Sequence, residues 1–108
     1  MYVIKTDANG NVSWEKNAVS GDHSYIARKF IQAEDGGFVI VGQGTDAGGA
    51  VVKLDDSGTR VWEYNMQGLP TAITKTSDGY IVAGHVTPDF AVDKIFVLKL
   101  DANGSRIW

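Results

Sequence analysis

Apolar residues along this chain gather in short runs with no helical spacing. Two runs are continuous and lack alternation of apolar and polar positions, namely Phe38-Val39-Ile40-Val41 and Ile95-Phe96-Val97-Leu98. Short runs rich in Val, Ile and aromatic residues, bounded by Gly, Asp and Asn, are typical of β-strands. A continuous run indicates a strand that is covered on both faces. The pattern predicts an all-β fold in which sheets pack against sheets.

One phrase occurs three times, beginning at Lys5, Lys53 and Lys99, and it keeps Lys, Asp, Gly and Trp at identical spacing. A period of about 20–50 residues marks solenoids, propellers or repeat arrays. A second phrase, Asp-Gly followed by an apolar run, occurs twice, at 35–42 and 78–84. We interpret the chain as a single repeat domain over residues 1–108. It contains a half-unit at 1–16 and two units at 24–65 and 70–108.

Each complete unit is expected to form four antiparallel strands joined by hairpins. The second and third strands contain the apolar runs, and the insertions between copies lie in the expected loops, where length varies most readily. The expected first strands are 26–34 and 72–77, the second strands 38–43 and 80–85, the third strands 2–6, 50–54 and 95–100, and the fourth strands 12–16, 60–64 and a stub at 106–108.

The repeated Asp, Gly and Trp have structural uses in the hairpin between the third and fourth strands. An Asp side chain can accept hydrogen bonds from backbone N–H groups two residues on, and a Gly three residues later supplies the positive φ of a tight hairpin with a bulge. Aromatic residues at equivalent repeat positions indicate packing between units. The expected structural anchors are therefore Trp14, Trp62, Trp108, Asp7, Asp55, Asp101, Gly10, Gly58 and Gly104.

These phrases resemble a family of bacterial and archaeal β-propeller-like tandem repeats. Its consensus runs roughly S-D-G-G-Y-I-V-A-G and then V-V-K-L-D-x-x-G-x-x-x-W, and the segments 53–62 and 78–84 are closest to it. The hairpin is also distantly similar to quinoprotein-type propeller repeats, in which a late Trp docks against the adjoining blade. The resemblance covers nearly the whole chain. It implies four-stranded blades, about two and a half per chain, and an exported or cell-surface protein.

Complete propellers have about four to eight blades, so two and a half units leave apolar flanks that another surface must bury. The expected partner is a second copy of the chain. The expected function is a non-enzymatic structural or interaction scaffold, because fold alone does not imply an activity. The alternative is a glycan- or small-molecule-binding ring that uses loops on one face. The ligand, the ring size and the oligomer number are left open.

The composition excludes several classes of function. A net charge of −3 and a pI near 5.1 lack the basic footprint of a nucleic-acid-binding domain. The chain has no Cys, which excludes a disulfide framework, a thiolate nucleophile and a Cys-ligated zinc site. No apolar run approaches the roughly 18 residues of a membrane-spanning helix, and no signal peptide is expected in this chain. The compartment stays open on these grounds.

Candidate metal ligands and acid–base groups are few. The stretch 7–11 places oxygen ligands at alternate positions, as a calcium loop does, but an EF-hand loop needs Gly and Glu where this chain has Val12 and Ala18. The two histidines, His23 and His85, occupy different repeat positions and are not placed for a metal or a catalytic triad. We therefore predict no metal, no cofactor and no catalytic residue.

Two further features have a structural explanation as good as a functional one. The carboxylate pairs Glu34-Asp35 and Asp55-Asp56 lie at expected turns, whereas a glycosidase needs two carboxyl groups that converge across a cleft. Phe90 is an exception among the aromatics, because it lies in the longer loop at 87–93. An aromatic side chain in a loop is a candidate contact residue, and folding back onto its own unit is the alternative.

Overall fold

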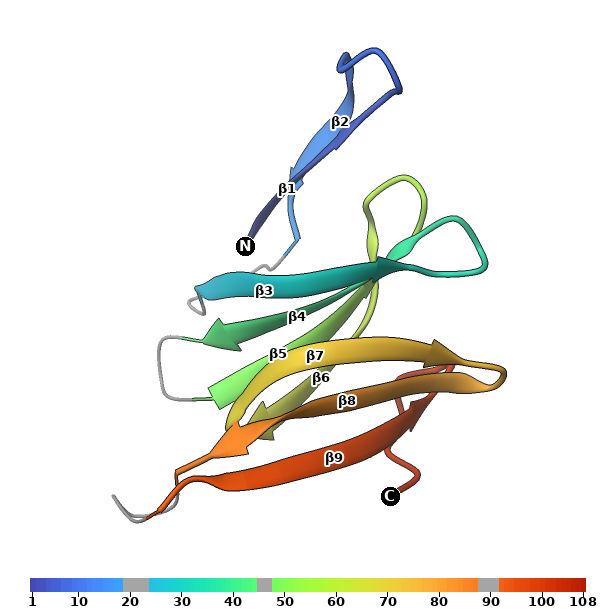
Figure 1. The fold of residues 1–108 in the computed structure, drawn as a ribbon. Coiled ribbons are helices and arrows are strands. Elements are labelled where there is room, and N and C mark those ends of the chain that lie inside the picture. The colour runs from blue at the N-terminus through green and yellow to red at the C-terminus, as the bar shows by residue number, and fades with distance from the viewer. Residues whose placement is uncertain (19–23, 45–47, 88–91) are drawn as a thin grey trace.

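The computed structural model describes residues 1–18, 24–44, 48–87 and 92–108, which form antiparallel sheets connected by hairpins (Figure 1). The N-terminal sheet contains β1 (Tyr2–Thr6) and β2 (Val12–Asn17). The central sheet contains β3 (Tyr25–Gln32), β4 (Phe38–Gly44), β5 (Gly48–Leu54) and β6 (Arg60–Gln67). The C-terminal sheet contains β7 (Leu69–Thr76), β8 (Gly79–Val86) and β9 (Lys94–Asp101). The predicted all-β class is confirmed, with three antiparallel sheets of two, four and three strands.

The strands of the two larger sheets occupy equivalent positions, down to their irregularities. The register shifts between Ala27 and Lys29 where β3 pairs with β4, and between Pro70 and Ala72 where β7 pairs with β8. Aligning these bulges makes Phe30 equivalent to Ile73, because they are paired with Ile40 and Val82 in the two second strands. The repeat seen in the sequence is thus a repeat of local structure.

Several predicted strand boundaries need correction. The strand β6 continues to Gln67 rather than ending at residue 64, and β3 ends at Gln32 rather than at residue 34. The strand β7 begins at Leu69 rather than at residue 72, because Leu69 and Pro70 already pair with His85 and Gly84 ahead of the bulge. A proline is tolerated near the start of a strand. The predicted stub 106–108 is not a strand. It is held to β9 by an isolated bridge between Leu100 and Arg106 and by two backbone hydrogen bonds to Lys99.

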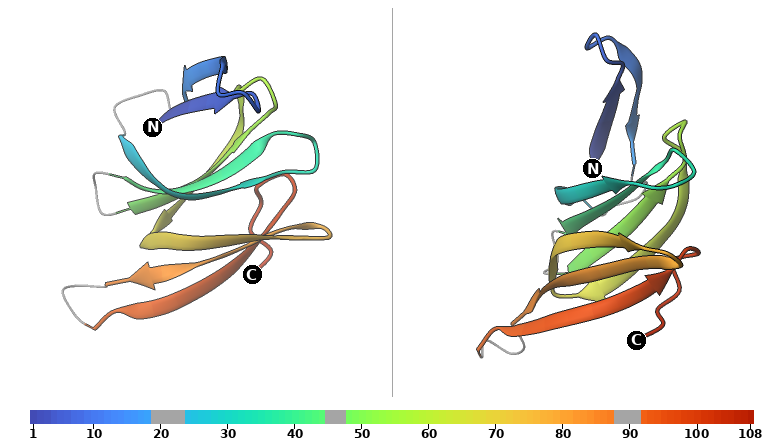
Figure 2. Two further views of the ribbon diagram at one scale, coloured as in Figure 1. Left: turned by 45° about the horizontal axis from the view of Figure 1, so that its top comes forward. Right: turned by 45° about the vertical axis from the view of Figure 1, so that its right-hand side comes forward.

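The sheets follow one another in a row, with the two termini at opposite ends of the row (Figures 1 and 2). One apolar core lies between the central and C-terminal sheets, and its buried residues include Val39, Val41, Val51, Ile73, Val82 and Leu98. A second core lies between the N-terminal hairpin and the opposite face of the central sheet, and it is formed by Ala18, Ile40, Ala50, Val52 and Leu54. Each buried Val, Ile or Leu contributes about 1.5–3 kcal/mol of transfer free energy.

The prediction that continuous apolar runs are covered on both faces is right for one run and wrong for the other. In the central sheet the run 38–41 supplies Val39 to one core and Ile40 to the other. In β9, however, Ile95 is 86% exposed and Val97 is 51% exposed, while Val51, the equivalent of Val97, is fully buried. Among the described residues no further sheet packs on the outer face of the C-terminal sheet, which explains the difference.

Candidate functional site

The three repeated Asp residues accept backbone hydrogen bonds inside their own turns. Oδ1 of Asp7 accepts from the amides of Asn9 and Asn11, both at 2.9 Å. Asp55 and Asp101 make the same two bonds, at 2.8–3.0 Å, to the residues two and four positions on. The glycine three residues after each Asp has a φ of 81–84°. Each turn is therefore closed by its own Asp and permitted by its own Gly.

These hydrogen bonds stabilise the ionised form of the carboxyl groups. The pKa of Asp7 lies below its usual value, chiefly because the Asn11 amide donates to the carboxylate. The pKa of Asp55 is also lowered, first by the hydroxyl of Ser57 and then by the amide of Thr59. Both carboxyl groups lie at solvated turns. Hydrogen bonding to the charged form, rather than a buried acid–base arrangement, is the cause.

The tryptophans connect one unit to the next. The indole N–H of Trp14 donates to the carbonyl of Asp56 at 2.9 Å, and that of Trp62 donates to the carbonyl of Ala102 at 3.0 Å. In each case the acceptor is the residue that follows the repeated Asp in the next turn. The ring centroid of each Trp also lies 6.1–6.3 Å from that of the aromatic residue near the start of the second strand of the next unit, Phe38 for Trp14 and Tyr80 for Trp62.

The same tryptophans lie directly against the turn glycines of the next unit. A Cβ atom at Gly58 would lie 2.7 Å from Cζ3 of Trp14, and one at Gly104 would lie 2.6 Å from Cδ2 of Trp62. These glycines are required twice, for the positive φ and for the close approach of the indole. The structure thus brings Trp14 to Gly58 and Trp62 to Gly104.

The third Trp and the first turn do not meet within the described chain. The side chain of Trp108 is exposed, and its residue is 54% accessible. Apart from Gly10 and its two chain neighbours, no described residue has an atom within 4 Å of the position that a Cβ at Gly10 would occupy. Trp108 is at the C-terminal end of the row of sheets, and the turn 7–11 is at the other end (Figure 1). The chain therefore presents the two halves of one more Trp–turn contact on opposite ends.

The repeated Lys has a partner in each complete unit. Lys53, only 4% accessible, places Nζ 2.7 Å from Oδ2 of Asp35 and also donates to the carbonyl of Leu54. Lys99 lies 2.8 Å from Oδ1 of Asp78. Both aspartates belong to the hairpin between the first and second strands, and Lys is the main cause that lowers the pKa of each. This pairing was not predicted from the sequence, although the identical spacing of the three Lys residues was a signal for it.

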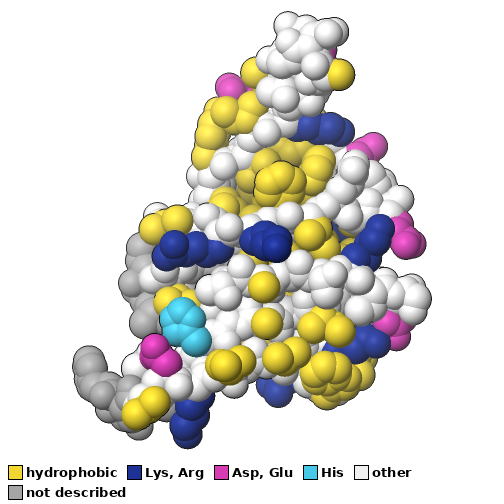
Figure 3. Space-filling view, viewed as in Figure 1, with side chains coloured by type: hydrophobic (Ala, Val, Ile, Leu, Met, Phe, Trp, Pro, Cys, Tyr) yellow, Lys and Arg dark blue, Asp and Glu magenta, His cyan; other side chains and the backbone are white. Residues whose placement is uncertain are grey.

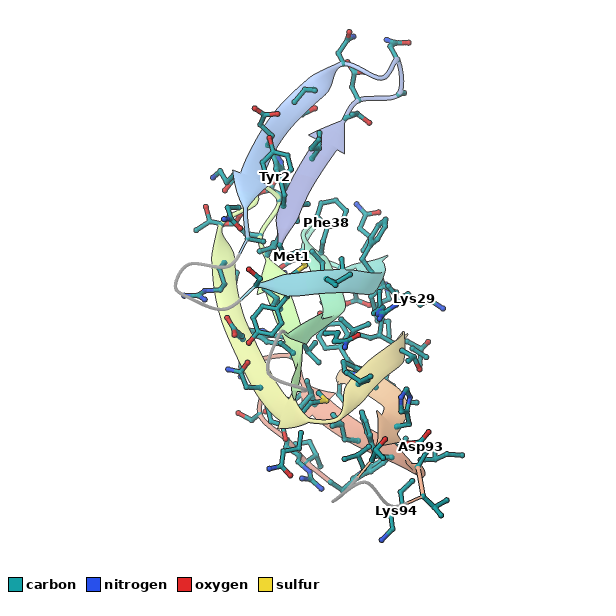
Figure 4. All side chains as sticks on the ribbon, turned by 90° about the vertical axis from the view of Figure 1, so that its left-hand side faces the viewer. Met1, Tyr2, Lys29, Phe38, Asp93 and Lys94 are labelled. Atoms are coloured by element: carbon teal, nitrogen blue, oxygen red, sulfur yellow. The ribbon has the colours of Figure 1, made fainter. Side chains whose placement is uncertain are left out.

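Lys5 occupies the equivalent position in the half-unit but has a different environment. Its Nζ lies 5.7 Å from the ring centroid of Phe38. Beside it runs a groove of about 520 Å³ between β1 and the first two strands of the central sheet, lined mainly by apolar and aromatic side chains, with Lys5 and Gln32 among its polar members. Hydrophobic side chains gather below the projecting N-terminal hairpin in the space-filling view (Figure 3), and Phe38 lies there beneath the hairpin (Figure 4).

The remaining candidate residues are not brought together. His85 pairs with Leu69 and Ile95 in the C-terminal sheet, and no three His, Cys, Asp or Glu side chains of the described residues cluster as a metal site would require. His23 and Phe90 lie outside the described residues. The carboxylate pairs Glu34-Asp35 and Asp55-Asp56 lie at hairpin turns and do not converge on a common site. Asp35 binds Lys53 and Glu34 lies 3.9 Å from Lys75, while Asp56 contributes its carbonyl to Trp14.

No helix in the described ranges is long and apolar enough to cross a membrane. Comparison with protein-family models, with curated proteins and with solved structures finds no match, so that the molecule's own geometry carries the functional argument.

Proposed function

We propose that the chain is a non-enzymatic, propeller-type repeat module that assembles with copies of itself head to tail and serves as a structural or interaction scaffold. The observation that carries the proposal is the Trp–turn contact, which occurs twice inside the chain and whose two halves lie open at its ends. In the proposed contact, Trp108 of one copy donates its indole N–H to the carbonyl of Ala8 of the next and covers Gly10.

The accessible apolar surface at the two ends supports the same arrangement. Val97 and Ile95 are exposed on the outer face of the C-terminal sheet, and Tyr2 and Ile4 are exposed on the N-terminal hairpin. Stacking one copy on the next would remove these side chains from water at about 25 cal/mol per Å² of apolar surface. The contact is heterologous, because different surfaces of the two copies meet, so that it closes into a ring or continues into a filament.

The test is the mass of the chain in solution by light scattering at micromolar concentration. Wild type is expected to exceed the 11.6 kDa of one chain. Trp108→Ala removes an anchoring Trp, which costs about 2 kcal/mol or more of association free energy, and it is expected to lower the mass. Val92→Ala, at another exposed apolar residue, is the matched control and should leave the mass unchanged.

The turn 7–11, which would receive Trp108, needs a different kind of variant. Its proposed acceptor is the backbone carbonyl of Ala8, which no side-chain substitution removes, so the test instead blocks the space that the indole would occupy. Gly10→Asn keeps a residue that tolerates positive φ but adds a side chain where the indole would lie. It should lower the mass as Trp108→Ala does, with little change in the melting temperature of the monomer. A wild-type chain that remains a monomer, or a mass that neither variant changes, would contradict the head-to-tail contact.

A further inference from the structure

The groove beside β1 occupies the place that the first two strands of a unit fill in the larger sheets. In the described chain β1 pairs only with β2, whereas β5, the equivalent third strand, pairs with β6 on one side and with β4 on the other. The free edge of β1 and the neighbouring faces of β3 and β4 are the walls of this groove. Its shape is that of a sheet from which a hairpin is missing.

The backbone of β1 has hydrogen-bonding groups along the open edge. The carbonyl of Met1 accepts from the amide of Ala18, on the side of β2. Since backbone groups alternate in direction along an antiparallel strand, those of Tyr2, Ile4 and Thr6 are directed to the free edge. An exposed edge of this kind is a template for an added strand.

The side chains that line the groove show what is missing. Phe30 is 64% exposed, whereas Ile73, its equivalent in β7, is 5% exposed because it packs in the core with Val39 and Val41 of the second strand of the preceding unit. A second strand added to β1 would cover Phe30 in the same way. The groove is therefore an uncovered half of an inter-sheet core rather than a solvated surface.

Lys5 indicates the charge of the missing segment. In both complete units the equivalent Lys binds the Asp of an Asp-Gly hairpin, as Lys53 binds Asp35 and Lys99 binds Asp78. Lys5 has the same sequence position and lies on the groove. A hairpin that carries an acidic residue at its turn would provide the carboxylate that is absent there.

From these observations we propose that the groove binds, in trans, an amphipathic β-hairpin with an Asp-Gly turn. Its second strand adds antiparallel to the free edge of β1, and its Asp pairs with Lys5. The register follows from the complete units, in which the first aromatic of the second strand faces the residue after the Lys, as Phe38 faces Leu54 and Tyr80 faces Leu100. That aromatic would face Thr6. The groove does not include the turn 7–11 that would receive Trp108, although Tyr2 and Ile4 belong both to its lining and to the proposed stacking surface. Hairpin binding in the groove goes beyond the proposed function.

The probe is a synthetic peptide with the sequence of residues 69–86, the hairpin β7–β8 of the chain itself. It is cyclised through its ends, because an isolated two-stranded hairpin is marginally stable in water and ordering it would weaken binding. Binding is measured by titration into isotope-labelled chain. The expected result is saturable binding that shifts the amide signals of Tyr2, Ile4 and Thr6 and protects them from hydrogen exchange.

The ion pair gives matched variants on both sides. Lys5→Met in the chain or Asp78→Asn in the peptide is expected to weaken binding about tenfold, equivalent to about 1.4 kcal/mol. Lys5→Asp combined with a peptide carrying Asp78→Lys is expected to recover most of the loss. Trp108→Ala should leave peptide binding unchanged, so that failure of the assembly contact and failure of the groove are told apart.

Four results would overturn the proposal. One is the absence of binding by a soluble cyclic peptide, and another is binding that shifts the signals of β9, which would mean exchange with the chain's own hairpin. The third is a lower solution mass caused by Lys5→Met in the chain alone, which would assign the groove to a second copy. Stabilisation by a soluble oligosaccharide in place of the peptide would likewise assign it to a different ligand.

Discussion

The indole of Trp62 lies against Gly104, so closely that a Cβ atom at residue 104 would be 2.6 Å from Cδ2 of the ring. This contact joins the fourth strand of one sheet to the turn of the next, and Trp14 repeats it with Gly58. The two contacts, with their indole hydrogen bonds, fix the spacing between successive sheets at the turns that contain Gly58 and Gly104.

Gly104→Ala is expected to destabilise the fold more than Gly10→Ala. Both glycines have positive φ, 81° and 84°, so that Ala pays a similar backbone cost of about 1–2 kcal/mol at each. Only at residue 104 does the new methyl group meet an indole, which adds about 1–3 kcal/mol of overpacking. Chemical denaturation of the two variants under conditions where the chain is monomeric measures the difference. Equal losses would mean that the Trp62 ring moves aside at no cost.

Trp62→Ala is expected to destabilise the chain by about 3 kcal/mol, at the low end for loss of a buried Trp because the ring is only partly buried. The variant loses the contact with Tyr80 and the hydrogen bond to Ala102. His85→Ala is the control, since among the described residues His85 has its backbone pairing within the C-terminal sheet and no ring contact with a neighbouring sheet. Melting temperatures of the two variants within a degree or two of wild type would show that Trp62 is not an anchor.

The all-β fold class, the hairpins and the repeat could be predicted from the sequence, because they depend on local chemistry. Runs of Val, Ile and aromatics form strands wherever they occur, and Asp with Gly three residues later closes the turn by itself. The start of β7 was missed because Pro70 argues against a strand in isolation, and its place is decided by pairing with Gly84.

Tertiary context explains the other differences. Ile95–Leu98 has the composition of a doubly covered strand, yet exposure depends on whether another sheet packs on it, and this cannot be read from the run itself. The pairing of Lys53 with Asp35 joins residues from different phrases of the repeat, so that their proximity became evident only when the third strand was placed beside the first hairpin.

The Lys53–Asp35 pair is expected to respond unequally to removal of its two members. Lys53 is buried and Asp35 is exposed, with side-chain accessibilities of 5% and 58%. Asp35→Asn leaves a buried ammonium group without a counter-charge, whereas Lys53→Met replaces it with an apolar chain of similar length and leaves Asp35 solvated. We expect a loss of about 1–3 kcal/mol for Asp35→Asn and a smaller loss for Lys53→Met. Urea denaturation of both variants measures the order, and the reverse order would contradict the assignment.

The same carboxylates give the fold a defined acid sensitivity. The pKa of Asp35 is lowered first by the hydrogen bond from Lys53 and then by the amide of Gly37, and the pKa of Asp78 is lowered first by Lys99. A folded pKa below the ordinary value of 3.8 means that the unfolded chain takes up the proton first as the pH falls. The stability that these groups contribute is therefore fully present above about pH 4 and is lost as the pH decreases through the folded pKa values.

Asp35→Asn removes one of these groups and should flatten the dependence of unfolding free energy on pH below 4, while lowering stability near neutral pH. Val92→Ala, which changes an exposed side chain and removes no titratable group, is the control and should keep the wild-type slope. Urea titrations at a series of pH values between 2 and 7 separate the two variants. A wild-type chain whose stability does not fall below pH 4, or an Asp35→Asn variant with an unchanged slope, would show that the Lys–Asp pairs do not contribute to folding.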